Sequence, residues 1–284
     1  MIIQFLFISL MTIASVQASD SYIRNVRPLS QSFFEAEDGY PADVGCGVVA
    51  LTELMSYWHT ERGEDFDLAG FRFSELYSEP DARLNRLMQV VYRYTQSNTV
   101  PGLRAAYIAA RKYCADPNRP GCQSGVLKEV LSEGTGSVLT PDALLESMKK
   151  MSGESSHLNV RSLPFTEEGS WASHAQKIQQ VLSEQQPVIL FLRGLPPCLS
   201  KDESWDLLSW HYLVLVGFDE KQNTFEAISG WKALSKNRST GAEVHHRVSA
   251  TAGSAGYPAY VKCSVDELTF SLPDALWFEL EKSR

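Results

Sequence analysis

The sequence predicts an α+β fold, with helices in the first part of the chain and an antiparallel hairpin after them. From Cys46 onwards, apolar residues recur at spacings of three and four, the pattern of one face of a helix. Between about residues 60 and 156, further helical patterns are separated by prolines and glycines. After Pro187, two short and continuous apolar runs rich in β-branched residues predict buried strands.

We expect residues 1–18 to form a secretory signal peptide that is cleaved after Ala18. This stretch has no charged side chain, and Val16-Gln17-Ala18 presents small or β-branched residues where a signal peptidase reads. Its apolar run of about 15 residues is shorter than the roughly 20 that a membrane span needs. No later segment is long and apolar enough to cross a bilayer, so we expect a secreted or periplasmic protein.

The charge balance and the spacing of potential ligands narrow the classes of partner. The chain has 26 basic and 34 acidic side chains, which argues against a nucleic-acid or anionic-membrane partner. No Cys-x2-Cys pair is present, and His245-His246 is an isolated doublet that we expect in a solvated loop. We therefore expect no metal ion and no cofactor. The sequence gives no indication of the oligomeric state.

The stretch from Gln31 to His59 contains the first candidate for chemistry. A turn rich in glycine, proline and aspartate ends where the helical periodicity of Ala50, Leu51, Leu54, Met55 and Trp58 begins. This places Cys46 at or within one residue of a helix N-terminus, where the main-chain N–H groups and the helix dipole stabilise a thiolate. The alternative interpretation is a small buried hydrophobic residue, which is the commoner role of a cysteine outside disulfides.

The five cysteines can be sorted if the protein is exported, because disulfides then form between pairs. Cys114 and Cys122 bracket a turn-rich segment that can bring two sulfur atoms together locally. Cys198 and Cys263 are the preferred second pair, although four cysteines allow three pairings. This pairing leaves Cys46 as the remaining thiol.

Helices are expected over residues 84–94, 103–113 and 175–183, and another from Pro141 through Met148. Thr140 is the expected N-cap of that helix, and Pro141 occupies its first position. A buried strand is expected from Pro187 to Leu192. A second strand over residues 209–218, a turn over 219–223 and a returning strand over 224–228 form a hairpin. His211 lies near its start, beside a loop. A histidine in a buried strand is by default a satisfied core residue, but this position also suits a base that faces a cleft.

Taken in order, these motifs resemble the papain-like cysteine peptidases, and among them the bacteriocin-processing (double-glycine) peptidase-like branch. The matching stretches run from Val26 to Gln31, from Gly45 to Trp58, and from Leu182 through Pro187-Val188-Ile189 to His211-Tyr212 and Gly217-Phe218-Asp219. The resemblance implies a two-lobed fold with a helical lobe that carries the nucleophile and an antiparallel lobe that carries the histidine. It implies one catalytic domain over residues 19–284, with a helical insert around residues 60–170.

The resemblance also implies a role for each matching residue. Cys46 corresponds to the thiolate nucleophile, and His211 to its partner in an ion pair that later donates and accepts the proton. Gln31, together with the main-chain N–H of Cys46, corresponds to the oxyanion hole. The expected activity is therefore hydrolysis of peptide bonds in a peptide or protein substrate.

The third member of the catalytic set departs from the family pattern. The family has Asn or Asp after the hairpin, whereas the register here points to Ser229, followed by Trp231 as the expected shield of the polar pair. A serine hydroxyl accepts a hydrogen bond from the imidazole but supplies no charge. We therefore expect modest activity, an orienting group from elsewhere, or no catalysis. The alternatives to a peptidase are a thiol-dependent amidase or acyl transferase, and a catalytically silent binding protein of the same fold.

Overall fold

The structure, a computed structural model, describes residues 21–29, 33–35, 41–68, 70–77, 82–95, 98–99, 101–123, 137–153, 157–165, 171–193, 211–230, 233–234, 245–246, 260–271 and 273–280. Its helices are α1 (Cys46–Arg62), α2 (Phe73–Tyr77), α3 (Ala82–Tyr94), α4 (Pro101–Tyr113), α6 (Pro141–Met151), α7 (Trp171–Ser183) and the 3-10 helix η2 (Glu267–Ser271). Its strands are β1 (Ser21–Tyr22), β2 (Phe33–Glu35), β3 (Pro41–Asp43), β4 (Asn98–Thr99), β5 (Ser137–Val138), β6 (Leu158–Leu163), β7 (Val188–Leu192), β8 (His211–Asp219), β9 (Thr224–Ile228), β10 (Ala233–Leu234), β11 (His245–His246), β12 (Tyr260–Ser264) and β13 (Asp274–Leu280). The α+β class is confirmed.

The principal sheet has seven strands and is antiparallel throughout. Its order is β12-β9-β8-β7-β13-β6, and β1 pairs with the far end of β8. The predicted hairpin forms its centre, since β8 and β9 pair with a bulge between Leu215 and Gly217. His211 through Gly217 are all buried, whereas a strand covered on one face alternates between buried and exposed residues. Both faces of the sheet are therefore covered at β8, where α1 and α7 pack.

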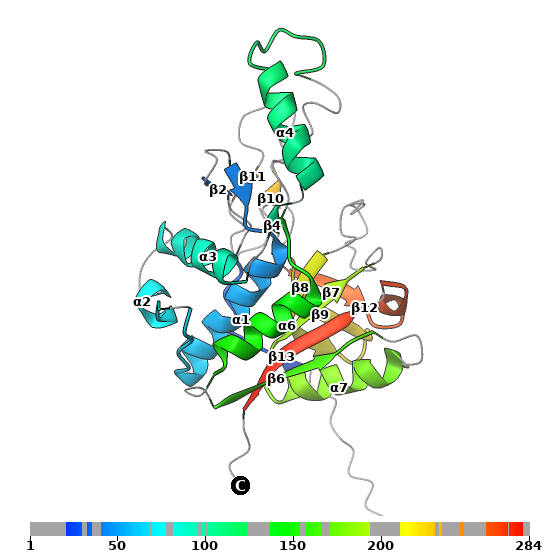
Figure 1. Cartoon of the computed structure of the whole chain (residues 1–284). Helices are drawn as coiled ribbons and strands as arrows, with labels where there is room; N and C mark the ends of the chain where they lie inside the picture. Colours follow the sequence, from blue (N-terminus) through cyan, green and yellow to red (C-terminus); the bar gives the residue numbers. More distant parts are fainter. Residues whose placement is uncertain are drawn as a thin grey trace, which may run out of the picture.

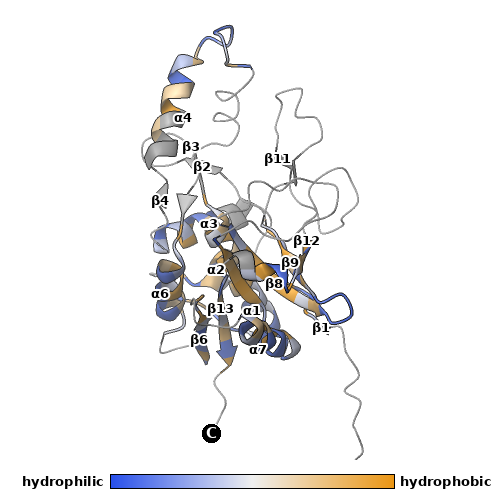
Figure 2. Cartoon of the chain, turned by 90° about the vertical axis from the view of Figure 1, so that its right-hand side faces the viewer, coloured by the Kyte–Doolittle hydropathy of each residue, from blue (hydrophilic) through white to orange (hydrophobic). Residues whose placement is uncertain are grey.

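Helix α1 lies in the core, and its burial exceeds the single apolar face that the sequence predicts. Every residue from Gly47 to Trp58 is buried, so the helix is enclosed on all sides. Two of its polar side chains bond to the helix itself: Thr52 donates to the Val48 carbonyl at 2.8 Å, and Ser56 to the Thr52 carbonyl at 2.7 Å. These bonds let hydroxyl groups enter an apolar core without the cost of an unsatisfied donor. Figure 2 shows the apolar residues concentrated on α1 and the strands beside it.

The segment from 60 to 170 is mainly helical, as expected, but it also adds a strand to the sheet. The N-cap prediction is confirmed, because the Thr140 hydroxyl accepts from the Ala143 N–H at 3.3 Å and Pro141 opens α6. The sequence did not predict β6, which pairs along its whole length with β13. Helix α7 begins at Trp171, four residues before the predicted start, and the Trp171 indole donates to the Val265 carbonyl at 2.6 Å.

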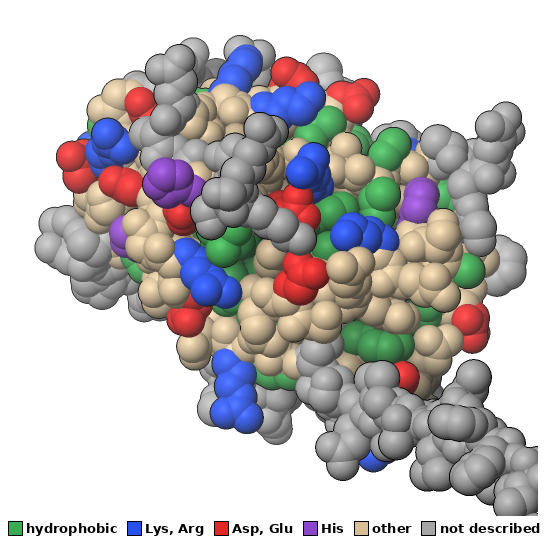
Figure 3. Space-filling model, turned by 90° about the horizontal axis from the view of Figure 1, so that it is seen from below, with side chains coloured by type: hydrophobic (Ala, Val, Ile, Leu, Met, Phe, Trp, Pro, Cys, Tyr) green, Lys and Arg blue, Asp and Glu red, His purple; other side chains and the backbone are tan. Residues whose placement is uncertain are grey.

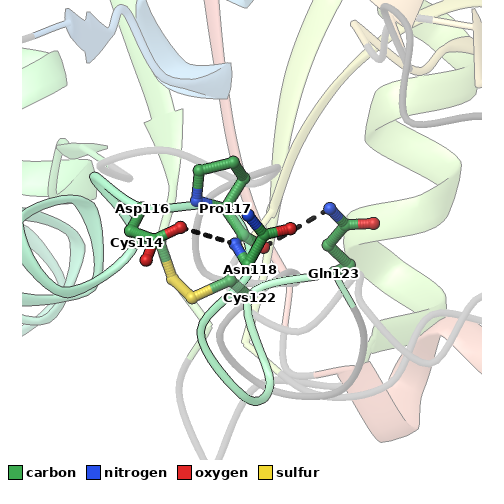
Figure 4. The surroundings of a disulfide bond; sticks show 6 residues. All are labelled: Cys114, Asp116, Pro117, Asn118, Cys122 and Gln123. Carbon is green, nitrogen blue, oxygen red and sulfur yellow. Dashed lines mark hydrogen bonds between the residues drawn. A yellow bond between two sulfur atoms is a disulfide. The ribbon is translucent and has the colours of Figure 1, made fainter.

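Helix α4 and the disulfide loop that follows it extend away from the sheet in both Figure 1 and Figure 2. The predicted disulfide between Cys114 and Cys122 is present, with Cα atoms 5.6 Å apart. Within the loop, Asp116 accepts from the Asn118 N–H at 3.0 Å, as Figure 4 shows. Cys263 is disulfide-bonded as well. Its expected partner, Cys198, lies outside the described residues, so that pairing stays a prediction.

The described surface carries charges of both signs. On the face shown in Figure 3, basic and acidic side chains are interspersed. Arg161 and Glu279 form an ion pair at 2.6 Å between β6 and β13. None of the helices in the described part of the chain is both long and apolar enough to span a membrane. The expected signal peptide, residues 1–18, lies outside the described residues.

Candidate active site

Cys46 is the first residue of α1, as the sequence predicts. The preceding residue, Gly45, is the N-cap and has a φ of 80°, a conformation that favours glycine because it has no Cβ. The first helical hydrogen bond joins the Val49 N–H to the Gly45 carbonyl at 3.2 Å. Cys46 is half-buried and carries a thiol. The N–H groups of the first turn have no acceptor within a helix, so their positive ends face the region of the sulfur.

His211 is the first residue of β8 and is only 2% exposed. Its Nε2 atom lies 2.7 Å from the main-chain carbonyl oxygen of Ser229. A carbonyl oxygen can only accept, so Nε2 must carry the proton of this hydrogen bond. In the neutral imidazole, Nδ1 then holds the lone pair and is the atom that can act as a base.

Burial lowers the pKa of His211 from 6.5 to about 4, and the hydrogen bond to the Ser229 carbonyl offsets a part of this effect. The imidazole is therefore neutral in the resting protein at pH 7. This differs from the resting ion pair that the family resemblance implies. A neutral ring with its lone pair on Nδ1 is a general base, which becomes charged only after it takes a proton.

Two packing contacts bring the start of α1 beside the hairpin. A Cβ atom added to Gly47 would lie 3.1 Å from Cε2 of Tyr212 and 3.2 Å from Leu139, so only glycine fits there without displacing a neighbour. A Cβ atom added to Gly230 would lie 3.4 Å from Cγ1 of Val49. The residues that precede Gly47, Tyr212 and Gly230 are Cys46, His211 and Ser229. Three of the four residues selected from the sequence therefore come from elements that meet at one place.

Ser229 lies next to His211, but through a different atom from the one expected. The sequence argument assigned its hydroxyl as the acceptor, whereas the main-chain carbonyl oxygen makes the contact. Gly230 follows with a φ of 65°, a left-handed conformation that glycine adopts without strain. This turn directs the carbonyl toward the imidazole. The group that accepts from the imidazole in this contact is thus a neutral main-chain carbonyl.

The remaining sequence candidates are either not described by the structure or belong to another strand pair. Gln31 and Trp231 lie outside the described residues. His245 and His246 form the short strand β11, paired with β10, and not the loop that the sequence analysis expected. Among the described residues, no group of three or more His, Cys, Asp or Glu side chains is arranged to hold a metal ion.

Two buried carboxyl groups near the site were missed by the sequence analysis. Asp274 accepts from the Phe165 N–H at 2.6 Å and pairs with Arg193, whose preceding residue lies opposite His211 across the β7–β8 pair. Glu53, 1% exposed on α1, accepts from the Leu29 N–H at 2.7 Å. The available signal for Glu53 was a lone acidic residue within a helix of apolar neighbours. For Asp274 we find no comparable signal.

Comparisons with known proteins add little to the functional evidence that the geometry of the site provides. No protein-family model matches this chain, and no curated protein matches its sequence. Among solved structures, one match is the crystal structure of xylellain, a cysteine protease from Xylella fastidiosa. It is 10% identical, with a TM-score of 0.33, over 90% of this chain and 85% of that chain. At this TM-score the likeness carries no argument, so the functional case depends on the residues of the site.

Proposed function

We propose that the protein is a cysteine peptidase in which Cys46 is the nucleophile and His211 the general base. One observation carries the proposal: the Nε2 atom of His211 is bonded to the Ser229 carbonyl at 2.7 Å, which reserves Nδ1 for the proton of a nucleophile. The contact of Gly47 with Tyr212 supports the assignment, because it brings the preceding Cys46 toward His211. A thiol at a helix N-terminus with a histidine as its base is a constellation used in nucleophilic catalysis.

The chemical steps follow from the neutral imidazole. As Sγ of Cys46 attacks the carbonyl carbon of the scissile bond, Nδ1 of His211 takes the thiol proton. The imidazolium then donates this proton to the leaving nitrogen, the C–N bond breaks, and a thioester with Cys46 remains. In the second half, His211 takes a proton from water, the hydroxide oxygen attacks the thioester, and the thiol is regenerated as the acid leaves.

The negative oxygen of each tetrahedral intermediate needs hydrogen-bond donors. We assign this role to the main-chain N–H of Cys46, at the start of α1, and to the side-chain amide of Gln31. The helix N-terminus adds a favourable dipole at the same point. One such donor contributes on the order of 3 kcal/mol to the stabilisation of the transition state in comparable sites.

The proposed architecture is papain-like, with two lobes: the helices that surround α1 form one and the antiparallel sheet forms the other. The assignment to the bacteriocin-processing branch depends on the order of the sequence motifs. We propose a peptide or protein as substrate. Disulfide bonds, such as that between Cys114 and Cys122, persist in oxidising compartments, which supports an exported protein.

The test is hydrolysis of fluorescein-labelled casein at neutral pH. Wild-type protein is expected to release labelled peptides, and Cys46→Ala is expected to release none above background. The matched control replaces both Cys114 and Cys122 by serine. It removes two cysteines that form a disulfide outside α1, and it should retain activity. Full activity of Cys46→Ala would overturn the assignment of the nucleophile.

The second candidate is a catalytically silent binding protein of the same fold. It is favoured by the acceptor behind His211, since a neutral carbonyl supplies no charge to stabilise the imidazolium. A thiol-dependent amidase or acyl transferase is the third candidate, and it shares the same first half-reaction. Mass analysis of products from peptide, isopeptide and ester substrates separates the two enzymes, while absence of an acylated Cys46 with all three favours the silent protein.

A further inference from the structure

Tyr212 lies where the start of α1 meets β8, and the chemistry proposed above does not use its side chain. It is 2% exposed. Phe191 is directly opposite on β7, on the same face of the sheet, and the centroids of the two rings are 4.6 Å apart. A phenylalanine at position 212 would fill this apolar site without bringing a hydroxyl group into the core. The presence of the hydroxyl therefore needs an explanation.

The Tyr212 hydroxyl holds Leu139, the residue that follows β5. It donates to the main-chain carbonyl of Leu139 at 2.7 Å, across a sequence separation of 73, and Leu139 is itself buried. Burial raises the pKa of the phenol, so the hydroxyl keeps its proton and remains a donor at neutral pH. The charge of a Cys46 thiolate adds to this effect, which places the Cys46 side chain near the phenol.

Gly47 lies against both of these residues. A Cβ atom at position 47 would be 3.1 Å from Cε2 of Tyr212 and 3.2 Å from both Cβ and Cδ2 of Leu139. Carbon atoms in contact are ordinarily about 3.5–4.0 Å apart, so the tyrosine ring and the leucine side chain leave no room for a methyl group. The hydrogen bond between Tyr212 and Leu139 thus closes a clamp over the first turn of α1. We use the word clamp for Gly47, Leu139 and Tyr212 together.

The clamp connects the two residues of the proposed pair. On α1, Cys46 directly precedes Gly47, and on β8, His211 directly precedes Tyr212. Each therefore lies one Cα–Cα step, about 3.8 Å, from a residue of the clamp. The imidazole is oriented separately, by the bond from its Nε2 atom to the Ser229 carbonyl. The position of the thiol relative to the imidazole then depends on where the first turn of α1 is held.

We infer that Tyr212 is a positioning residue, which closes the clamp and thereby keeps the thiol of Cys46 within reach of His211. The inference rests on the proposed function, because it concerns the transfer of the thiol proton to His211. A change in the clamp should slow the reactions of Cys46 that need this base, and it should leave the reactions of a thiolate already formed unchanged. The alternative is a contact that contributes only to stability, in which case neither kind of reaction changes in the folded protein.

The test is the rate of alkylation of Cys46 by iodoacetamide, measured by mass spectrometry at pH 6 and at pH 9.5. The thiolate is the reacting species, and an ordinary thiol has a pKa of about 8.5. The reaction therefore needs the base at pH 6, whereas at pH 9.5 most of the thiol is ionised without it. In Tyr212→Phe the rate at pH 6 should fall by about fivefold or more, because a small misplacement of reacting groups lowers the rate steeply. The rate at pH 9.5 should stay within about twofold of wild type.

Gly47→Ala disturbs the clamp from the side of the helix. Its methyl group must displace Tyr212 or Leu139, so the rate should again fall at pH 6 and not at pH 9.5. In the Tyr212→Phe background Leu139 is no longer held, and Gly47→Ala should cost less there than in wild type. Gly153→Ala is the matched control, because a Cβ atom there would meet only the Lys150 carbonyl, at 3.4 Å. It should leave both rates unchanged.

The outcomes separate this role from the proposed function. Where Tyr212→Phe does not fold, Gly47→Ala alone provides the test. Equal losses at both pH values, no loss at pH 6, or additive effects of the two substitutions would overturn the positioning role of Tyr212. A wild-type protein that reacts at pH 6 no faster than its urea-unfolded chain would instead overturn the proposed function, and the role with it.

Discussion

Helix α1 and the arm, formed by helix α4 and the disulfide loop that follows it, differ in their surroundings. Helix α1 is buried from Gly47 to Trp58 against the sheet. Helix α4 extends away from that sheet and ends in a loop closed by a disulfide, with Tyr113 41% exposed and the Arg119 guanidinium 5.1 Å from its ring. Burial of apolar surface stabilises α1, whereas a covalent bond and a local cation–π contact stabilise the loop that follows α4. The candidate site belongs to the packed region, so changes there should affect chemistry and changes in the arm should not.

Replacement of Cys46 is expected to give the largest effect. Cys46→Ala should lower hydrolysis by about 10⁴-fold or more, because the remaining groups cannot form the thioester. The free energy of unfolding should change by less than about 1 kcal/mol, since the side chain is half-buried and small. Steady-state kinetics and urea unfolding on the same preparation check both statements. A large loss of stability with the loss of activity would mean that Cys46 is mainly a packing residue.

Acidification should lower the free energy of unfolding, because the buried imidazole of His211 is neutral in the folded protein. Its pKa is about 4 when folded and 6.5 ordinarily, so the unfolded chain binds more protons between these values. The contribution of the neutral imidazole to the free energy of unfolding is complete above pH 6.5. It falls by about 3 kcal/mol as the pH is lowered to about 4. The contribution of Glu53 to the free energy of unfolding changes with pH in the opposite direction, because its pKa is raised on folding.

Urea unfolding at pH 7, 5.5 and 4 measures this dependence. His211→Asn is the comparison that isolates it, since Glu53 is present in both proteins. The difference in free energy of unfolding between wild type and His211→Asn should shrink as the pH falls. A constant difference would contradict the burial of a neutral imidazole.

Loss of the disulfide in the arm should have a smaller and separate effect. Replacing Cys114 and Cys122 together by serine should lower the free energy of unfolding by about 2.5 kcal/mol, the value for closure of a loop with a sequence separation of 8. Hydrolysis by Cys46 should be unchanged, because the arm is stabilised locally. Reduced activity in this variant would show that the arm supports the site, and the contrast between the two regions would fail.

The smallest effect is expected at the N-cap of α6. Thr140→Ala removes the acceptor of the Ala143 N–H and should cost about 1 kcal/mol, whereas Thr140→Ser keeps the acceptor and should be nearly neutral. Leu139, the preceding residue, accepts from the Tyr212 hydroxyl at 2.7 Å. A thermal unfolding series of the three proteins tests this, and equal midpoints would contradict the cap.

The sequence predicted best what local chemistry determines. The start of α1 at Cys46, the Thr140 cap, the disulfide of the arm and the hairpin with His211 all follow from short-range patterns. It did not predict β6, because its pairing with β13 joins residues more than a hundred positions apart. Such pairing leaves no trace in either segment alone.

At the site itself, the sequence predicted which residues lie together better than it predicted which of their atoms make the contacts. It selected Ser229, but the contact through the carbonyl depends on the backbone turn at Gly230, which side-chain patterns do not encode. The spacing of the apolar residues of α1 predicts one buried face, whereas Thr52 and Ser56 are buried as well, because both hydroxyls bond to carbonyls of the helix itself. Glu53 is buried too, and its partner, the Leu29 N–H, lies outside the helix and 24 positions away in the sequence.

The central claim is that Cys46 and His211 act as one catalytic pair. Its most direct test is the rate of alkylation of Cys46 by iodoacetamide at pH 6, measured by mass spectrometry in the folded protein, in the urea-unfolded chain and in His211→Ala. The pair predicts that the folded protein reacts at least tenfold faster than the unfolded chain, and that His211→Ala removes this advantage. A folded rate equal to the unfolded one, and the same with or without His211, would contradict the pair.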